Sequence, residues 1–208
     1  TDLNVLATFD PKIPEALRTP KLIMLGNMVP ALQLAVLDRT SGPRFVVTDT
    51  MNFWIDSQRE DLGKVLLRTD LLVINEEEAW QLSGERHIGR VAAALLALGP
   101  KGVVIKRGEY GAMLFHEGNV FSAPGFPLDV VIDPTGAGDA FAGGLVGYLA
   151  NSPKIDHDTL RAAVIHGSAV ASFCVQGVST QRLESLTATE LNQRIRAFDE
   201  LVRFPHAG

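Results

Sequence analysis

A glycine-rich turn with two carboxylates, AspProThrGlyAlaGlyAsp, occupies residues 133–139. Gly136 and Gly138 permit positive φ angles and let the backbone approach a bound group closely. The residues that follow have a helical pattern, so the turn is expected to open a helix whose first amides and dipole attract negative charge. The amides of residues 136–139 therefore predict an anion hole for a group that gains negative charge during a reaction.

Asp139 stands in the first turn of the expected helix. A carboxylate at this place is stabilised by the helix dipole, so a purely structural helix start is one interpretation. A carboxylate inside an anion-binding turn should, however, repel a bound phosphate. The conflict is resolved if Asp139 faces a hydroxyl and accepts its proton as a phosphoryl group arrives.

Small residues follow Asp139 along the expected helix, and close packing against a neighbour is the interpretation that we accept for them. They are Ala140, Ala142, Gly143, Gly144 and Gly147. A tightly packed helix would hold the turn rigidly.

Two other glycine motifs for phosphate groups are excluded. No GxxxxGK[ST] string occurs, and the dinucleotide pattern GxGxxG would need glycine where Phe141 stands. Together with the late position of the turn in the chain, Phe141 argues against an NAD-dependent dehydrogenase.

The first half of the chain alternates short apolar runs with helical patterns. Strands are expected at 21–25, 44–48, 71–74 and 102–106, and helices at 31–37, 59–68 and 88–98. Apolar runs that are nearly continuous are typical of parallel strands covered on both faces. The pattern predicts a doubly wound, mostly parallel α/β sheet with helices on both faces.

The second half has a different rhythm. A β-hairpin is expected at 111–115 and 120–123, one more strand at 128–132, and helices at about 137–150, 156–175 and 188–202. No linker or repeat is visible, so we expect a single domain over residues 1–208.

Polar residues follow several of the expected strands. In open α/β sheets ligands bind beyond the carboxyl ends of the strands, so these ends are the expected site. The residues there are Asp49, Asn52, Asn75, Glu78, Lys106, Gly108 and the stretch from Asp133 to Asp139.

Composition excludes several classes of protein. The net charge is −5 and no dense Lys/Arg run occurs, which argues against a nucleic-acid surface. No apolar run could span a membrane and no signal pattern opens the chain, so we expect no membrane partner and a cytoplasmic location.

Cys174 is the single cysteine and is expected to be a buried thiol. No pair of the five histidines has zinc-ligand spacing.

The stretch AspProThrGlyAlaGlyAspAlaPheAlaGlyGly, residues 133–144, resembles the second signature of the PfkB/ribokinase family of sugar and nucleoside kinases, D-[ST]-T-G-A-G-D-x-F. The chain fits the family from about residue 20 to its end. The resemblance implies a ribokinase-like fold and ATP-dependent transfer of the γ-phosphoryl group to a hydroxyl of a sugar or nucleoside. Gly136, Ala137 and Gly138 would form the anion hole, and Asp139 would be the catalytic base. Pro134 departs from the usual Ser or Thr.

Further positions match the family. Asn75 and Glu78 fit its N-x-x-E motif, which is implicated in the Mg²⁺–phosphate network, with water between Glu78 and the metal. The same two residues also fit a capping box, and both roles can coexist. Lys106 and Gly108 resemble the segment that borders the nucleotide phosphates, and a hairpin lead-in with a solvated lysine is the alternative.

Two resemblances concern only some members of the family. A monovalent cation such as K⁺ is bound by the equivalents of Asp133 and Thr135, together with carbonyls that the loop at 173–180 could supply. The stretch 49–54 resembles D-x-N-x-R, but Trp54 replaces the arginine, which puts a role in binding an anionic group in doubt.

The first strand, Gly-Gly motif and lid of family members are largely absent, and residues 1–10 are interpreted as a remnant of the lid and edge strand. We expect a fragment of a complete kinase rather than a truncated form. The alternative is a nucleotide-binding or assembly module that lacks turnover. The sequence does not identify which sugar or nucleoside is the substrate. A homodimer formed through lids also stays open.

Overall fold

The computed structural model describes residues 9–203, so most of the expected lid remnant at 1–10 lies outside the described residues. Contacts divide the chain into two compact units, Thr1–Lys101 and Gly102–Gly208, and each is described by itself. The expectation of a single domain stays a prediction. Among the residues that the structure describes, no helix is both long and apolar enough to cross a bilayer.

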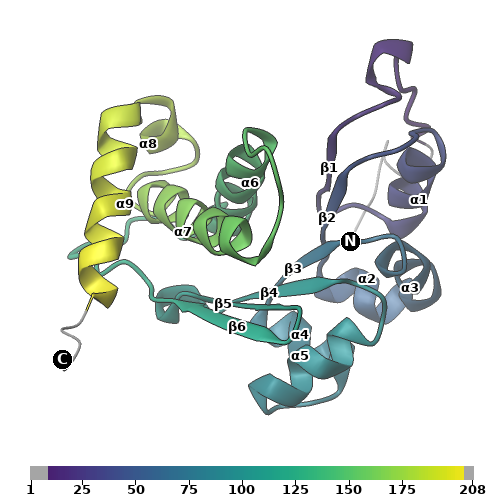
Figure 1. Cartoon of the computed structure of the whole chain (residues 1–208), viewed down its shortest axis with the longest axis horizontal. Helices are drawn as coiled ribbons and strands as arrows, with labels where there is room; N and C mark the ends of the chain where they lie inside the picture. Colours follow the sequence, from purple (N-terminus) through teal and green to yellow (C-terminus); the bar gives the residue numbers. More distant parts are fainter. Residues whose placement is uncertain (1–8, 204–208) are drawn as a thin grey trace. The chain divides into compact units, whose positions relative to one another are not determined.

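The first unit alternates strands and helices (Figure 1). Its strands are β1 (Leu22–Leu25), β2 (Phe45–Asp49) and β3 (Leu71–Asn75). Its helices are a short 3-10 turn η2 (Glu15–Leu17), α1 (Pro30–Asp38), α2 (Asn52–Ser57), α3 (Arg59–Leu66), α4 (Glu76–Ser83) and α5 (Ile88–Leu96). The strands and helices expected here are confirmed to within about two residues at most ends, and α2 is an addition.

The three strands of this unit are parallel, in the order β1–β2–β3. Leu22 pairs with Phe45, and Val47 pairs with Leu71. Every residue of β2 is buried, so both faces of this strand are covered. The expected parallel α/β arrangement is therefore confirmed within the unit, and the carboxyl ends of its strands share one edge.

One face of β1 and β2 packs against α1 and α3. Ile23, Leu25 and Val46 form a cluster there with Leu37 of α1 and Val65 of α3. Leu62, Val65 and Leu66 recur on one side of α3, which explains why that helix folds onto the sheet, whereas α1 is largely apolar all round. This packing fixes where β1 and β2 end.

The second unit contains a three-stranded antiparallel segment and a group of helices. Its elements are β4 (Gly102–Lys106), a 3-10 turn η3 (Gly108–Tyr110), β5 (Ala112–His116), β6 (Asn119–Ala123), α6 (Ala137–Ala150), α7 (His157–Cys174), α8 (Gln181–Glu184) and α9 (Ala188–Val202). Lys106 pairs with Ala112 and His116 with Asn119, so the expected hairpin is confirmed.

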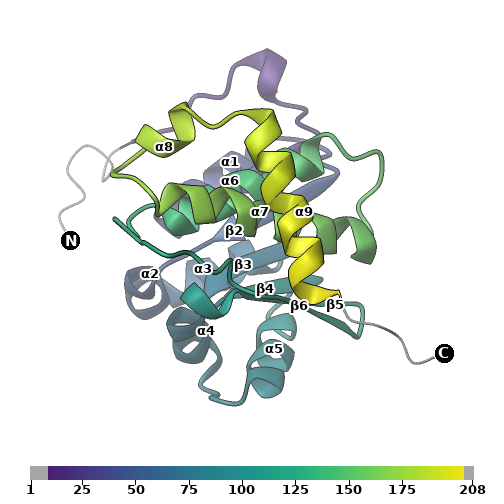
Figure 2. The same ribbon diagram turned by 90° about the vertical axis from the view of Figure 1, so that its left-hand side faces the viewer.

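The long helices of this unit pack on each other. Figures 1 and 2 show α6 and α7 side by side and α9 crossing α7. A Cβ on Gly144 would lie 2.9 Å from a methyl carbon of Val170, and a Cβ on Gly167 would lie 2.7 Å from the Phe141 carbonyl oxygen. The close packing expected for the small residues is thus confirmed at Gly144, whereas a Cβ on Gly143 or Gly147 would meet nothing within 4 Å.

The strand expected at 128–132 does not form, so that prediction is wrong. Val130, Val131 and Ile132 are each more than half exposed. The amides of Ile132 and Asp133 donate to the Val175 carbonyl, at 2.8 and 3.3 Å, instead of to a neighbouring strand. The β-branched residues favoured a strand, but the backbone there is bound to the end of α7.

Candidate active site

The glycine-rich turn leads directly into α6. Gly136 has φ +81° and is the N-cap of the helix, and its carbonyl accepts a hydrogen bond from the Ala140 amide at 2.8 Å. This left-handed conformation is the reason for glycine at this position. At the start of the turn, the Asp133 carboxylate accepts a hydrogen bond from the Thr135 amide at 2.9 Å, and this bond lowers the pKa of Asp133.

The amides of the turn differ in how they are engaged. The Ala137 amide donates to the Pro134 carbonyl at 3.2 Å, so one of the three nitrogens expected for the anion hole is already bound within the turn. Between residues 9 and 203, the amides of Gly136, Gly138 and Asp139 donate to no other group. Unengaged amides at the N-terminus of a 14-residue helix are suited to hold an anion.

Charged groups of both signs lie at this turn. Asp139 is in the first turn of α6 and is exposed, so its carboxylate is not turned into the protein interior. Lys106, the last residue of β4, has its side-chain nitrogen 3.3 Å from the position that a Cβ on Gly138 would take. The structure therefore brings together a general-base candidate, unengaged amides and a cation.

The loop that follows Lys106 is held tightly. Gly108 and Gly111 have φ +56° and +89°, and the Arg107 amide donates to the Gly111 carbonyl at 2.8 Å. A Cβ on Gly111 would lie 2.1 Å from the Ala123 carbonyl oxygen. The positive φ at Gly108 explains the glycine there, the close approach to a nucleotide stays a prediction, and Gly111 packs against the end of β6.

Asn75 and Glu78 form a capping box at the start of α4. The Glu78 amide donates to Asn75 Oδ1 at 2.8 Å, and the Asn75 amide donates to Glu78 Oε2 at 3.1 Å. The structural interpretation of this pair is confirmed. Its role toward Mg²⁺ stays a prediction, and the described residues contain no group of three or more metal-ligating side chains.

The stretch after β2 is arranged around a tryptophan. Asp49 is buried and its carboxylate accepts a hydrogen bond from the Thr50 amide at 2.8 Å. Trp54 is 5% exposed and its indole N–H donates to Asn27 Oδ1 at 2.9 Å. Trp54 is therefore a buried, neutral side chain held by Asn27. Asn27 was not among the residues predicted from the sequence, although it lies just after β1 in the way that Asn75 lies at the end of β3.

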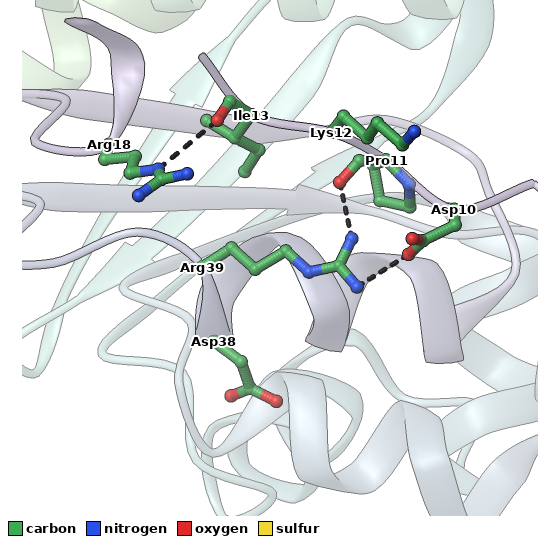
Figure 3. Close-up of a pocket in the computed structure, with 7 residues that line it drawn as sticks. All are labelled: Asp10, Pro11, Lys12, Ile13, Arg18, Asp38 and Arg39. Atoms are coloured by element: carbon green, nitrogen blue, oxygen red, sulfur yellow. Dashed lines mark hydrogen bonds and ion pairs between the residues drawn. The ribbon is translucent and has the colours of Figure 1, made fainter. Parts of the chain in front are cut away.

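A cavity of about 610 Å³ is lined by residues that precede β1 and β2 in the chain (Figure 3). Arg39 pairs there with Asp10 at 2.6 Å and donates to the Pro11 carbonyl at 2.5 Å. None of the residues expected to be functional lines this cavity. A second, smaller cavity is lined by Glu77, Trp80, Gln81 and Arg86 of the α4 region.

The chain is similar to a family of kinases. The model of the "pfkB family carbohydrate kinase" matches residues 32–187. The cytidine kinase of Thermococcus kodakarensis is 34% identical over 146 residues, which cover 68% of this chain and 52% of that protein. The aminoimidazole riboside kinase of Salmonella typhimurium is 36% identical over 102 residues, covering 49% of this chain and 32% of that protein.

Solved structures agree with this comparison. The aminoimidazole riboside kinase from Salmonella enterica, complexed with aminoimidazole riboside and an ATP analog, aligns with a TM-score of 0.70 at 24% identity, over 86% of this chain and 64% of that one. A nucleoside kinase from Methanocaldococcus jannaschii aligns with a TM-score of 0.73 at 18% identity, over 93% and 60%. These two show a shared fold. The chain spans about half or less of the two curated relatives above.

Proposed function

This chain belongs to the pfkB family of carbohydrate kinases, and we propose that the protein transfers the γ-phosphoryl group of ATP to a hydroxyl of a sugar or nucleoside. The observation that carries the proposal is the turn at the start of α6. There an exposed Asp139 lies next to unengaged amides, and the Lys106 amine lies against Gly138. These are the groups that phosphoryl transfer to an alcohol requires.

The reaction divides the work among these groups. Asp139 accepts the proton of the acceptor hydroxyl while the oxygen of that hydroxyl bonds to the γ-phosphorus. The bond from that phosphorus to the bridging oxygen breaks, and ADP leaves with the electron pair. The Gly136 and Gly138 amides and the Lys106 amine stabilise the negative charge on the transferring group.

Phosphates and Mg²⁺ fit the residues present. Amide and ammonium donors at the turn suit an anion, and Glu78 supplies a carboxylate in the first turn of α4, directly after β3. Mg²⁺ in phosphoryl-transfer sites is held by one or two carboxylates, water and the substrate phosphates, so a dedicated cluster of protein ligands is not required. When bound, the metal neutralises charge on the phosphates. We assign Asn75 and Glu78 to hold this network through water.

A monovalent cation is the further cofactor that we propose. The Asp133 carboxylate is already ordered by the Thr135 amide, and the Val175 carbonyl at the end of α7 lies at the same segment. Carboxylate, hydroxyl and carbonyl oxygens are the ligands that K⁺ takes. Replacement of K⁺ by tetramethylammonium, a cation too large for such a site, should lower the turnover.

The test is a screen of the full-length protein with Mg²⁺, ATP and single acceptors. Cytidine and aminoimidazole riboside are the acceptors named for the two relatives above, and ribose and fructose add two simple sugars. We expect ADP and a phosphorylated acceptor in equal amounts, detected by mass spectrometry. Calorimetric binding of ATP with no phosphorylated product from a broad acceptor panel would instead support a nucleotide-binding module without turnover.

A further inference from the structure

The single cysteine lies beneath the proposed catalytic turn. Cys174, the last residue of α7, is 3% exposed. Its thiol donates to the Thr135 carbonyl at 3.8 Å, a weak hydrogen bond across 39 residues of sequence. Its sulfur also lies 3.8 Å from the position that a Cβ on Gly136 would take, which is ordinary van der Waals contact. The sulfur therefore fills the space on the inner side of the left-handed residue.

The residue after the cysteine holds the same segment. The Val175 carbonyl accepts hydrogen bonds from the amides of Ile132 and Asp133, at 2.8 and 3.3 Å. The carbonyl oxygens at the end of a helix have no partner within the helix, so this end of α7 is a natural acceptor for an incoming chain. The end of α7 therefore contacts this segment at two points. The Val175 carbonyl binds the amides of Ile132 and Asp133, and the Cys174 sulfur contacts the Thr135–Gly136 peptide.

The rest of α7 is fixed to the helix that carries Asp139. A Cβ on Gly144 of α6 would meet the His166 carbonyl oxygen at 3.0 Å, and a Cβ on Gly167 of α7 would meet the Phe141 carbonyl oxygen at 2.7 Å. Two helix backbones this close cannot slide without steric overlap. The end of α7 is accordingly a rigid base for the turn that starts α6.

The thiol suits this place better than a hydroxyl or a charged group. The side chain of Cys174 is almost fully buried, so an uncompensated charge at this position would be costly. A serine hydroxyl is closer to its own Cβ and would leave a gap under Gly136 and a poorly satisfied donor. An alanine would remove the contact altogether.

We propose that Cys174 is a positioning residue for phosphoryl transfer. Its sulfur supports the Thr135–Gly136 peptide and thereby fixes the direction of the neighbouring N–H groups and the position of the Asp139 carboxylate. The inference rests on the proposed function for its effect on turnover. The support of the turn itself is a structural statement, and it can be measured whether or not an acceptor is known.

The test compares Cys174→Ala, Cys174→Val and Val164→Ala in the full-length protein. Val164 is a fully buried residue of the same helix, ten positions earlier, so its truncation removes packing away from the turn. The first readout is amide hydrogen exchange of residues 133–139, followed at the hydrogen-bonded amides of Asp133, Thr135 and Ala137. For Cys174→Ala we expect it to rise by about tenfold, with exchange in α9 unchanged. Cys174→Val removes the S–H but fills the same space with a slightly larger apolar side chain, so exchange should stay within about threefold of the wild type.

The second readout is kinetic. For Cys174→Ala we expect kcat to fall by about ten- to a hundredfold, because small misplacements of reacting groups slow the reaction by such factors, while KM for ATP changes by less than about twofold. Val164→Ala should lower the melting temperature but keep kcat.

Wild-type exchange at 133–139 in Cys174→Ala would overturn the inference. An equal rise in exchange in Val164→Ala would overturn it as well, since the effect would then be general. Increased exchange with an unchanged kcat would remove the role in positioning for catalysis. If the wild type transfers no phosphate to any acceptor, the proposed function fails, and the exchange data alone still decide whether Cys174 supports the turn.

Discussion

Asn75 and Glu78 cap each other at the start of α4, each side chain accepting a hydrogen bond from the other's backbone amide. The arrangement is sufficient to explain why both residue types occur at this spacing. Capping neither requires nor excludes a role toward Mg²⁺, so that role needs a test that separates charge from capping.

Glu78→Gln makes that separation, because glutamine serves in a capping box as well as glutamate does. We expect the free energy of unfolding to change by less than about 0.5 kcal/mol. The Mg²⁺ concentration for half-maximal turnover should rise, because a carboxylate near the metal is lost. The matched control is Glu190→Gln, which alters the capping box of α9 with Thr187 and should leave the Mg²⁺ dependence unchanged. Unchanged Mg²⁺ dependence in Glu78→Gln would restrict Glu78 to capping.

Two adjacent glycines of α6 should respond to alanine in opposite directions. A Cβ on Gly143 meets nothing within 4 Å, and alanine is the better helix former, so Gly143→Ala should stabilise by about 0.5–1 kcal/mol. A Cβ on Gly144 meets Val170 at 2.9 Å, so Gly144→Ala should destabilise by about 1–3 kcal/mol. Urea denaturation of both variants measures the difference. Equal effects of the two changes would contradict the packing of α6 on α7.

A buried histidine predicts a loss of stability in mild acid. His116 stacks on His157 with ring centroids 5.9 Å apart, and burial is the main cause that lowers the pKa of His116. The positive charge that His157 can carry lowers this pKa too, whereas Glu117 and Asp156 raise it. A lowered pKa means that the unfolded chain binds the proton more readily than the folded one. The free energy of unfolding should therefore decrease as the pH falls through about 6.5, the ordinary value for histidine.

The variant that tests this is His116→Phe, which keeps a ring against His157 without a titrating group. The difference in unfolding free energy between variant and wild type should grow in favour of the variant from pH 8 to pH 5. His87→Gln, at the exposed N-cap of α5, is the control that removes a histidine elsewhere. Parallel pH profiles for wild type and His116→Phe would show that His116 does not contribute.

The three long helices of the second unit could be predicted because their ends are marked in the sequence, whereas the short helix α8 was not expected. The bounds expected for α6 and α9, 137–150 and 188–202, are those observed, and the small-residue run and the Thr187–Glu190 box explain why. The strand expected at 128–132 failed for the converse reason. Local β propensity cannot reveal that Val175, more than forty residues later, takes the amides of Ile132 and Asp133.

Contacts between distant segments were likewise not predictable from one sequence. The burial of Cys174 was expected and is confirmed, but no periodicity shows that its sulfur lies under Gly136. The proximity of Lys106 to Gly138 is of the same kind: the motifs indicated that both belong at strand ends, and only the fold brings them to contact distance. The pairing of Asn27 with Trp54 had no signal beyond the position of Asn27 after a strand.

The most direct test of the account is the turnover of Asp139→Asn in the full-length protein, measured beside its affinity for ATP. Asparagine keeps the size and the place at the start of α6 but cannot accept the proton of the acceptor hydroxyl. We predict that kcat falls by about 10²–10⁴-fold, while the Kd for ATP changes by less than about threefold. Turnover at the wild-type rate would contradict the assignment of Asp139 as the base, and with it the proposed mechanism.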